Sequence, residues 1–293
     1  MSGLENFYHK RYKLLLLIPL ALFLLSIFII WQFNEQNGDY FEKDVSLRGG
    51  VSATIYLDKE FNIENIESFL TEKLGREVFI RSLATTEGNT HGFLVEAVDI
   101  DADHLQALLE EFLAVDLNDE NFFVEETGSR LGEDFYAQMI RAVFIAFVLM
   151  CITVFIIFRK VVPSLAVILS ALLDLIVTIA LIDLLHIRIS AAGIAAVLLL
   201  VGYSIDTDML LTTRMIKRKE GTIWQRIVSS AKTGLTMTAA GLVTTLIGYF
   251  LATNLVLQQM FLIISLGLII DVIATYIMNA SLLTWYLEKK EHV

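Results

Sequence analysis

The heptapeptide Gly202-Tyr203-Ser204-Ile205-Asp206-Thr207-Asp208 places two carboxylates inside an apolar run long enough to cross a membrane. An Asp at the centre of a bilayer costs roughly 2.5–3.5 kcal/mol on insertion scales, so such residues usually face a partner or a water-filled path. A simpler interpretation is that each Asp only hydrogen-bonds a neighbouring helix or reaches the inner headgroups. The pair favours a membrane protein that moves something or couples to ions.

Apolar runs of membrane-spanning length recur along the rest of the chain, which is 56% hydrophobic. A run of about 20 apolar residues is needed to span the hydrocarbon core as a helix. The first run is longer than the apolar part of a signal peptide and no small-residue cleavage site follows it, so we expect it to remain in the mature protein. The sequence therefore predicts six spans, at residues 14–31, 142–158, 164–185, 189–211, 233–252 and 260–285.

Basic residues gather in alternate connections between these spans, which predicts the orientation of the chain. By the positive-inside rule, such connections face the cytoplasm. We therefore expect both termini to be cytoplasmic. The residues concerned are Lys10, Arg11, Lys13, Arg159, Lys160, Arg214, Lys217, Arg218, Lys219, Arg226, Lys289 and Lys290. Asp183 and Arg188 fall at the opposite ends of their spans, where we expect interfacial solvation.

Residues 32–138 differ from the rest because they are acidic, with 24 acidic and 7 basic residues. This net charge of −17 predicts a well-solvated domain outside the membrane and argues against binding of nucleic acid or anionic headgroups. The only cysteine, Cys151, falls within the second span, so the external domain has no disulfide. The expected domains are 1–31 (cytoplasmic N-terminus and first span), 32–138 (external) and 139–293 (five-span bundle with a cytoplasmic C-terminus).

The external domain has the pattern of a ferredoxin-like fold, strand–helix–strand–strand–helix–strand. Alternating apolar residues predict strands at 51–57, 78–83, 91–98 and 121–126, with residues 84–90 as a hairpin-like loop. Helical spacing predicts helices at 63–74 and 101–113, and Asp101 or Asp103 would cap the second. His91 and His104 stand alone, and no nucleophile, cofactor or metal-ligand motif is present. We therefore expect neither an enzyme nor a metal or cofactor site.

Further ionisable residues lie at membrane depth. Asp174 falls near the middle of the third span and Asp271 near the middle of the sixth, while Lys232, at the inner end of the fifth, is the nearest cationic candidate. Together with Asp206 and Asp208 they form the candidate ion-coupling set. The fifth span also carries small residues on one face, which favours close approach of a neighbouring helix: Gly234, Thr238, Gly241, Thr245 and Gly248.

The layout resembles half of a resistance-nodulation-division (RND) transporter, and the motifs resemble the SecF family of protein-export membrane proteins. Ser46–Gly50, containing Arg48, Gly49 and Gly50, is similar to the Gly-Gly motif that follows the first span in this family. Gly202, Tyr203 and Ser204 with the two acids, followed by Arg214, resemble its signature fourth span, in an Asp-Thr-Asp form typical of archaeal members. Asp174 and residues 267–279 look like the family's third and sixth spans.

The resemblance implies a helical polytopic membrane protein, an RND-like half with six transmembrane helices and an external ferredoxin-like domain. It implies an accessory subunit of the Sec machinery that assists polypeptide export across the cytoplasmic membrane. The implied partners are a SecD-like homologue, the translocation channel, exported polypeptides and membrane lipid, with coupling to an ion gradient. Asp206, four residues after Gly202, has the offset of the acid in SecD-type helices, which ranks it first for coupling, with Asp208 bonded inside the bundle to Ser204 or Thr212.

Two alternatives stay open from the sequence. One is an RND-type exporter half for lipids or small molecules, against which the single small external domain argues. The other is a scaffold that stabilises SecD without ion coupling, against which the intramembrane acids argue.

Overall fold

The computed structural model describes residues 3–57, 61–75, 78–84, 90–98, 100–118, 120–218, 221–252 and 254–291. The chain divides into two compact units. One consists of Met1–Glu42 together with Arg141–Val293, and the other of Lys43–Ile140. Each unit is considered by itself below.

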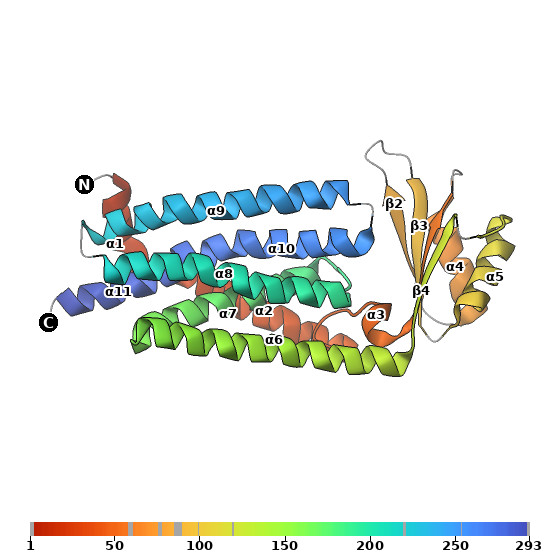
Figure 1. Cartoon of the computed structure of the whole chain (residues 1–293), viewed down its shortest axis with the longest axis horizontal. Coiled ribbons are helices and arrows are strands. Elements are labelled where there is room, and N and C mark those ends of the chain that lie inside the picture. The colour runs from red at the N-terminus through yellow and green to blue at the C-terminus, as the bar shows by residue number, and fades with distance from the viewer. Residues whose placement is uncertain are drawn as a thin grey trace. The chain divides into compact units, whose positions relative to one another are not determined.

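The smaller unit contains a four-stranded antiparallel sheet in the order β2-β3-β1-β4, with α4 and α5 on one face (Figure 1). The register pairs Ala53 with Val95 on one side and with Val124 on the other. This arrangement confirms the ferredoxin-like fold. Residues 85–89, the centre of the predicted hairpin loop, lie outside the described residues. The elements are α3 (Val45–Arg48), β1 (Gly50–Tyr56), α4 (Ile63–Leu74), β2 (Val78–Ala84), β3 (Thr90–Ala97), α5 (Ala102–Leu113) and β4 (Phe122–Thr127).

The core of this unit forms because the sheet and both helices bury apolar residues against each other. Ile55 and Phe93 on the strands are fully buried, as are Ile66 of α4 and Leu105 of α5. Asp101 caps α5 by accepting a 2.8 Å hydrogen bond from the backbone nitrogen of His104, which resolves the choice between the two predicted caps.

The larger unit is a helical bundle. Among the residues that the structure describes, six helices are long and apolar enough to cross a membrane, as predicted. Several helices extend beyond the predicted spans, because amphipathic turns with charged residues continue them on either side. The helices are α1 (Gly3–Leu15), α2 (Leu17–Asn37), α6 (Ser129–Phe158, which begins in the smaller unit), α7 (Val161–Leu184), α8 (Ala191–Lys217), α9 (Ile223–Leu251), α10 (Leu255–Ile273), the π-helical turn η1 (Ala274–Asn279) and α11 (Ala280–Glu291).

The ends of these helices follow from local chemistry. Pro19 has no backbone N–H to donate to residue 15, which explains the break between α1 and α2. Ser190 caps α8 by accepting a 3.0 Å hydrogen bond from the nitrogen of Gly193. Thr222 and Gln225 form a reciprocal capping box at the start of α9.

Three of the spans form the centre of the bundle. Half or more of the most apolar window is buried in α7, α8 and the continuous helix of α10, η1 and α11, against 11% in α2 and α6. In Figure 1, α9 and α10 run side by side. The small residues of α9 allow this approach, because a Cβ at Gly248 would lie 2.7 Å from the Phe261 ring. Thr245 and Ser265 also share a 2.7 Å hydrogen bond between their hydroxyls.

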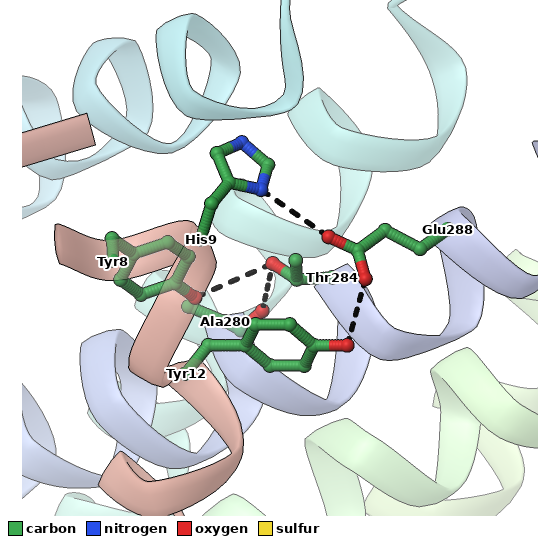
Figure 2. Close-up of polar contacts among 6 residues, drawn as sticks. All are labelled: Tyr8, His9, Tyr12, Ala280, Thr284 and Glu288. Carbon is green, nitrogen blue, oxygen red and sulfur yellow. Dashed lines mark hydrogen bonds and ion pairs between the residues drawn. The ribbon is translucent and has the colours of Figure 1, made fainter. Parts of the chain in front are cut away.

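One end of the bundle is closed by α1, which packs on α11 (Figure 2). Tyr12 donates a 2.7 Å hydrogen bond to Glu288 Oε2, and His9 Nδ1 lies 3.2 Å from Glu288 Oε1. The Tyr8 hydroxyl lies 3.3 Å from that of Thr284. We call this group of residues 8, 9, 12, 284 and 288 the terminal clasp. It joins the first helix to the last.

Candidate functional site: a buried intramembrane carboxyl cluster

Three carboxyl groups from three helices meet inside the bundle. Asp174 of α7, Asp208 of α8 and Asp271 of α10 are each at most 1% exposed. Asp271 is close enough to influence the charge of both other acids. We call these three residues the acid cluster.

Asp271 is surrounded by threonine hydroxyls. Thr207 Oγ1 lies 3.0 and 2.9 Å from its two carboxyl oxygens, and Thr275 Oγ1 lies 3.2 Å from Oδ1. Thr207 Oγ1 also lies 2.9 Å from the backbone oxygen of Ser204. Because a hydroxyl carries one hydrogen, Thr207 satisfies one of these acceptors at a time.

Asp208 has a different donor. Asn279 Nδ2 donates a 2.7 Å hydrogen bond to Asp208 Oδ1 and lies 3.4 Å from Thr212 Oγ1. This partner differs from Ser204 and Thr212, the two expected from the sequence. Asn279 and Thr275 are both supplied by η1, and a π-helical turn in the middle of a span is a recurrent feature of functional sites.

The cluster is incompletely satisfied by the residues around it. Among the residues that the structure describes, Asp174 Oδ1, Asp208 Oδ2 and Asn279 Oδ1 are buried without a hydrogen-bond partner. Ser170 and Ser204 lie near enough to act on Asp208 and Asp174, but their hydroxyls also lack a bond of good geometry. Three carboxyl groups cannot all be ionised in such an interior unless a bound cation compensates their charge. Without a cation, one or more of them must hold a proton. The site is therefore suited to taking up and releasing positive charge.

Asp206 lies on another face of α8. It is exposed, whereas Asp208 two residues later is fully buried, in agreement with the ~200° separation of such positions on a helix. Gly202 on the same face has no atom within 4 Å of a Cβ built on it, and Tyr203 is 40% exposed. The structure thus separates Asp206 from the acid cluster.

Lys232 does not join the cluster either. Its side chain is exposed on α9, where it lines an open cavity with Arg214. Arg214 is half-buried and donates a hydrogen bond from Nη1 to the backbone oxygen of Ser229. No group of three or more His, Cys, Asp or Glu in the described part of the chain is arranged to hold a metal ion.

The Gly-Gly motif serves the smaller unit. Gly50, at φ +134°, lies so close to β3 that a Cβ would be 2.4 Å from the backbone oxygen of Ala97. A Cβ on Gly132 would likewise lie 2.8 Å from the backbone nitrogen of Gly49. These distances leave no room for a side chain at Gly50 or Gly132, and Arg48 beside the motif is exposed.

Two ionisable residues near the far ends of their spans differ from the expectation. Asp183, for which interfacial solvation was expected, is 3% exposed, because α7 is central to the bundle. Arg188, also expected to be solvated, instead makes a 2.7 Å ion pair with Glu42.

Comparison with known proteins identifies the family of this chain. A family model described as "Protein export membrane protein SecD/SecF, C-terminal" matches residues 108–289. The protein-export membrane protein SecF of Methanothermobacter thermautotrophicus is 35% identical, covering 95% of this chain and 94% of its own length. SecF of Methanocaldococcus jannaschii is 34% identical, covering 95% and 96% respectively.

A solved structure has the same fold. The crystal structure of SecDF, a translocon-associated membrane protein from Thermus thermophilus, matches with a TM-score of 0.77 at 20% identity. The match covers 96% of this chain but 38% of the SecDF chain, so this chain spans about two fifths of that protein.

The apolar helices of membrane-spanning length and the ferredoxin-like unit, in the part of the chain that the structure describes, define a polytopic membrane protein with the fold of SecDF. The chain belongs to the SecF family of protein-export membrane proteins.

Proposed function

We propose that this chain is an accessory subunit of the Sec machinery, which assists export of polypeptides across the cytoplasmic membrane together with a SecD-like homologue. The family supports the export role. The match to two fifths of the SecDF chain supports a partner that supplies the remainder. The translocation channel and the exported polypeptide would be further partners, and no covalent chemistry is required of the chain.

The acid cluster is the observation that carries the coupling part of the proposal. Asp174, Asp208 and Asp271 come from three different helices, so a change of charge at one of them alters the packing of all three. Binding and release of a cation from an ion gradient would thereby shift α7, α8 and α10 relative to one another. That movement would be passed to the ferredoxin-like domain, residues 32–138, on the outer side of the membrane.

Asp206 has a different role in this proposal. An exposed carboxylate in a membrane span is costly unless a neighbour covers it. Leu199, Tyr203 and Asp206 recur at helical spacing on the exposed face of α8, with Gly202 leaving room for close approach. We assign this face to the contact with the SecD-like partner, so burial ranks Asp208 and Asp271 above Asp206 for ion coupling.

The test replaces each acid by its uncharged isostere in cells that depend on this chain for export. Asp208→Asn and Asp271→Asn should abolish export while the complex with the SecD-like protein still co-purifies. Asp206→Asn should weaken co-purification of the complex. Asp103→Asn, on the exposed surface of α5, is the matched control and should change neither.

The outcomes separate the alternatives. Full export by Asp208→Asn and Asp271→Asn at normal expression would contradict ion coupling and leave the scaffold function. If no SecD-like protein is recovered from native membranes with the unaltered chain, the export function is contradicted. The RND-type exporter half would then be the remaining alternative.

A further inference from the structure

A second polar site lies at the end of the bundle that carries the basic connections. It is a cavity of about 510 Å³ between the C-terminal part of α8 and the first turns of α9. This volume is within the range of small-molecule sites, about 300–1,000 Å³. The acid cluster and the terminal clasp contribute no residue to its lining.

Among the described residues, the ionisable side chains that line this cavity are both cationic. They are Arg214 of α8 and Lys232 of α9. Arg214 makes its hydrogen bonds to Ser229 through a single nitrogen, Nη1. Within the described part of the chain, no hydrogen bond or ion pair engages its other guanidinium nitrogens or the Lys232 ammonium. The remaining donors suit an anion with several oxygens, because a guanidinium fork and an ammonium both bind phosphate oxygens.

Neutral polar groups and an apolar wall complete the lining. Gln225, Ser229 and Thr233 offer amide and hydroxyl groups, while Val228 and Trp224 are apolar. The Trp224 ring packs on Tyr8, with ring centroids 5.4 Å apart, so its position is fixed by α1. Tryptophan beside basic residues at the end of a span is typical of the level of the lipid headgroups.

The depth of Lys232 also agrees with a headgroup site. It lies nine residues after the start of α9, about 14 Å along the helix axis. A lysine at that depth extends its aliphatic stem toward the interface and places its ammonium among the headgroups. A soluble anion would leave the apolar wall and this stem uncovered, whereas the upper acyl carbons of a lipid would cover both.

We propose that this cavity binds the phosphodiester headgroup of one anionic membrane lipid, held by Arg214 and Lys232 beside the Trp224 ring. Bound there, the lipid would join the end of α8 to the start of α9.

Trp224 itself provides the measurement. The chain has three tryptophans, and Trp31→Phe with Trp285→Phe leaves Trp224 as the only one. The full chain in detergent is titrated with phosphatidylglycerol whose acyl chains are brominated, and quenching of Trp224 is followed. Phosphatidylcholine with the same bromination is the neutral-headgroup comparison. We expect saturable quenching at one lipid per chain, at least fivefold tighter for phosphatidylglycerol.

The variants assign this preference to the cavity. Arg214→Gln with Lys232→Gln should weaken phosphatidylglycerol binding about tenfold or more, since each basic group near an anionic headgroup contributes about fivefold. Arg218→Gln with Lys290→Gln removes one exposed arginine and one exposed lysine from the same end and should change binding less than twofold. Lys232→Gln alone, at an exposed position, should weaken it about fivefold without affecting folding.

Three results would overturn the proposal. Equal quenching by the two lipids would show that the headgroup is not recognised. Equal losses of lipid affinity in the cavity variant pair and the control variant pair would show that binding depends only on surface charge. Displacement of the lipid by inorganic phosphate, but not by potassium chloride of matched ionic strength, would assign the cavity to a soluble phosphate.

Discussion

Asn279 donates a 2.7 Å hydrogen bond to Asp208, a residue 71 positions earlier in the chain. Both side chains are fully buried. This bond joins the signature fourth span to the π-helical turn of the last span. It gives one oxygen of a buried carboxyl its partner.

Removing that donor should destabilise the bundle. Asn279→Leu leaves Asp208 buried without its hydrogen bond, which costs about 1–3 kcal/mol. The midpoint of thermal unfolding in detergent should fall accordingly. Ser281→Ala is the matched control on the same helix, because the Ser281 hydroxyl is buried and unbonded among the described residues. An equal loss in both variants would contradict a specific contribution of the Asn279 bond.

The Thr207 hydroxyl should matter to Asp271 in the same way. Thr207→Val keeps the shape and removes the donor that lies 2.9 and 3.0 Å from the Asp271 carboxyl oxygens. We expect a loss of about 1–2 kcal/mol in unfolding free energy and reduced export. Thr207→Ser restores the hydroxyl and should recover most of both. If Thr207→Ser recovers neither stability nor export, the loss in Thr207→Val is due to altered packing and not to the missing hydroxyl.

The sequence was sufficient for the spans and the ferredoxin-like unit, because apolar length and periodicity are local signals. It placed five ionisable residues at membrane depth, but it did not separate the exposed Asp206 and Lys232 from the buried Asp174, Asp208 and Asp271. It was insufficient for their partners. Thr275 and Asn279 follow Asp271 by four and eight residues and could have been suspected as polar residues in an apolar run. The π-helical turn that carries them arises from tertiary packing. The face of α8 that each acid occupies is likewise decided by the neighbouring helices.

The terminal clasp should depend on Glu288. Glu288→Ala removes the acceptor of the 2.7 Å bond from Tyr12 and the partner of His9. Amide hydrogen exchange in α1 should become about tenfold faster, as expected for loss of about 1.4 kcal/mol of local stability. Lys289→Ala, the exposed neighbour, should leave the exchange unchanged. Unchanged exchange in Glu288→Ala would show that apolar packing alone holds α1.

Asp44 should make the smaller unit sensitive to pH. It caps α3, and burial raises its pKa from 3.8 to about 7, with nearby Glu96 and Glu125 acting in the same direction, against the hydrogen bonds from Ser46. Between about pH 4 and pH 7, Asp44 is therefore protonated in the folded chain but ionised in the unfolded chain. The free energy of unfolding consequently falls as pH rises through that window.

Asp44→Asn keeps the cap and removes the titration. The amide hydrogen-exchange rate of β1 is measured in the unaltered chain and in the variant, at about pH 5 and about pH 8. The ratio of the rate in the unaltered chain to the rate in the variant should be higher at about pH 8. Taking the ratio cancels the intrinsic pH dependence of exchange. A ratio independent of pH would contradict the assignment to Asp44.

The orientation can be tested with single cysteines in a Cys151→Ser background. Glu72→Cys lies on the exposed surface of α4, and Lys290→Cys lies on the exposed end of α11. A membrane-impermeant thiol reagent added to intact cells should label the first and spare the second, because the positive-inside rule predicts that the basic connections face the cytoplasm. The reverse labelling pattern would contradict the predicted topology.

The terminal clasp also imposes an order on synthesis. Tyr12 leaves the ribosome 276 residues before Glu288, the residue that receives its hydrogen bond. Until the last span is made, α1 has no α11 to pack on, and only earlier elements such as Trp224 of α9 can contact its aromatic side. The contacts of Tyr12 and His9 with Glu288 can therefore form only after the last span has been made.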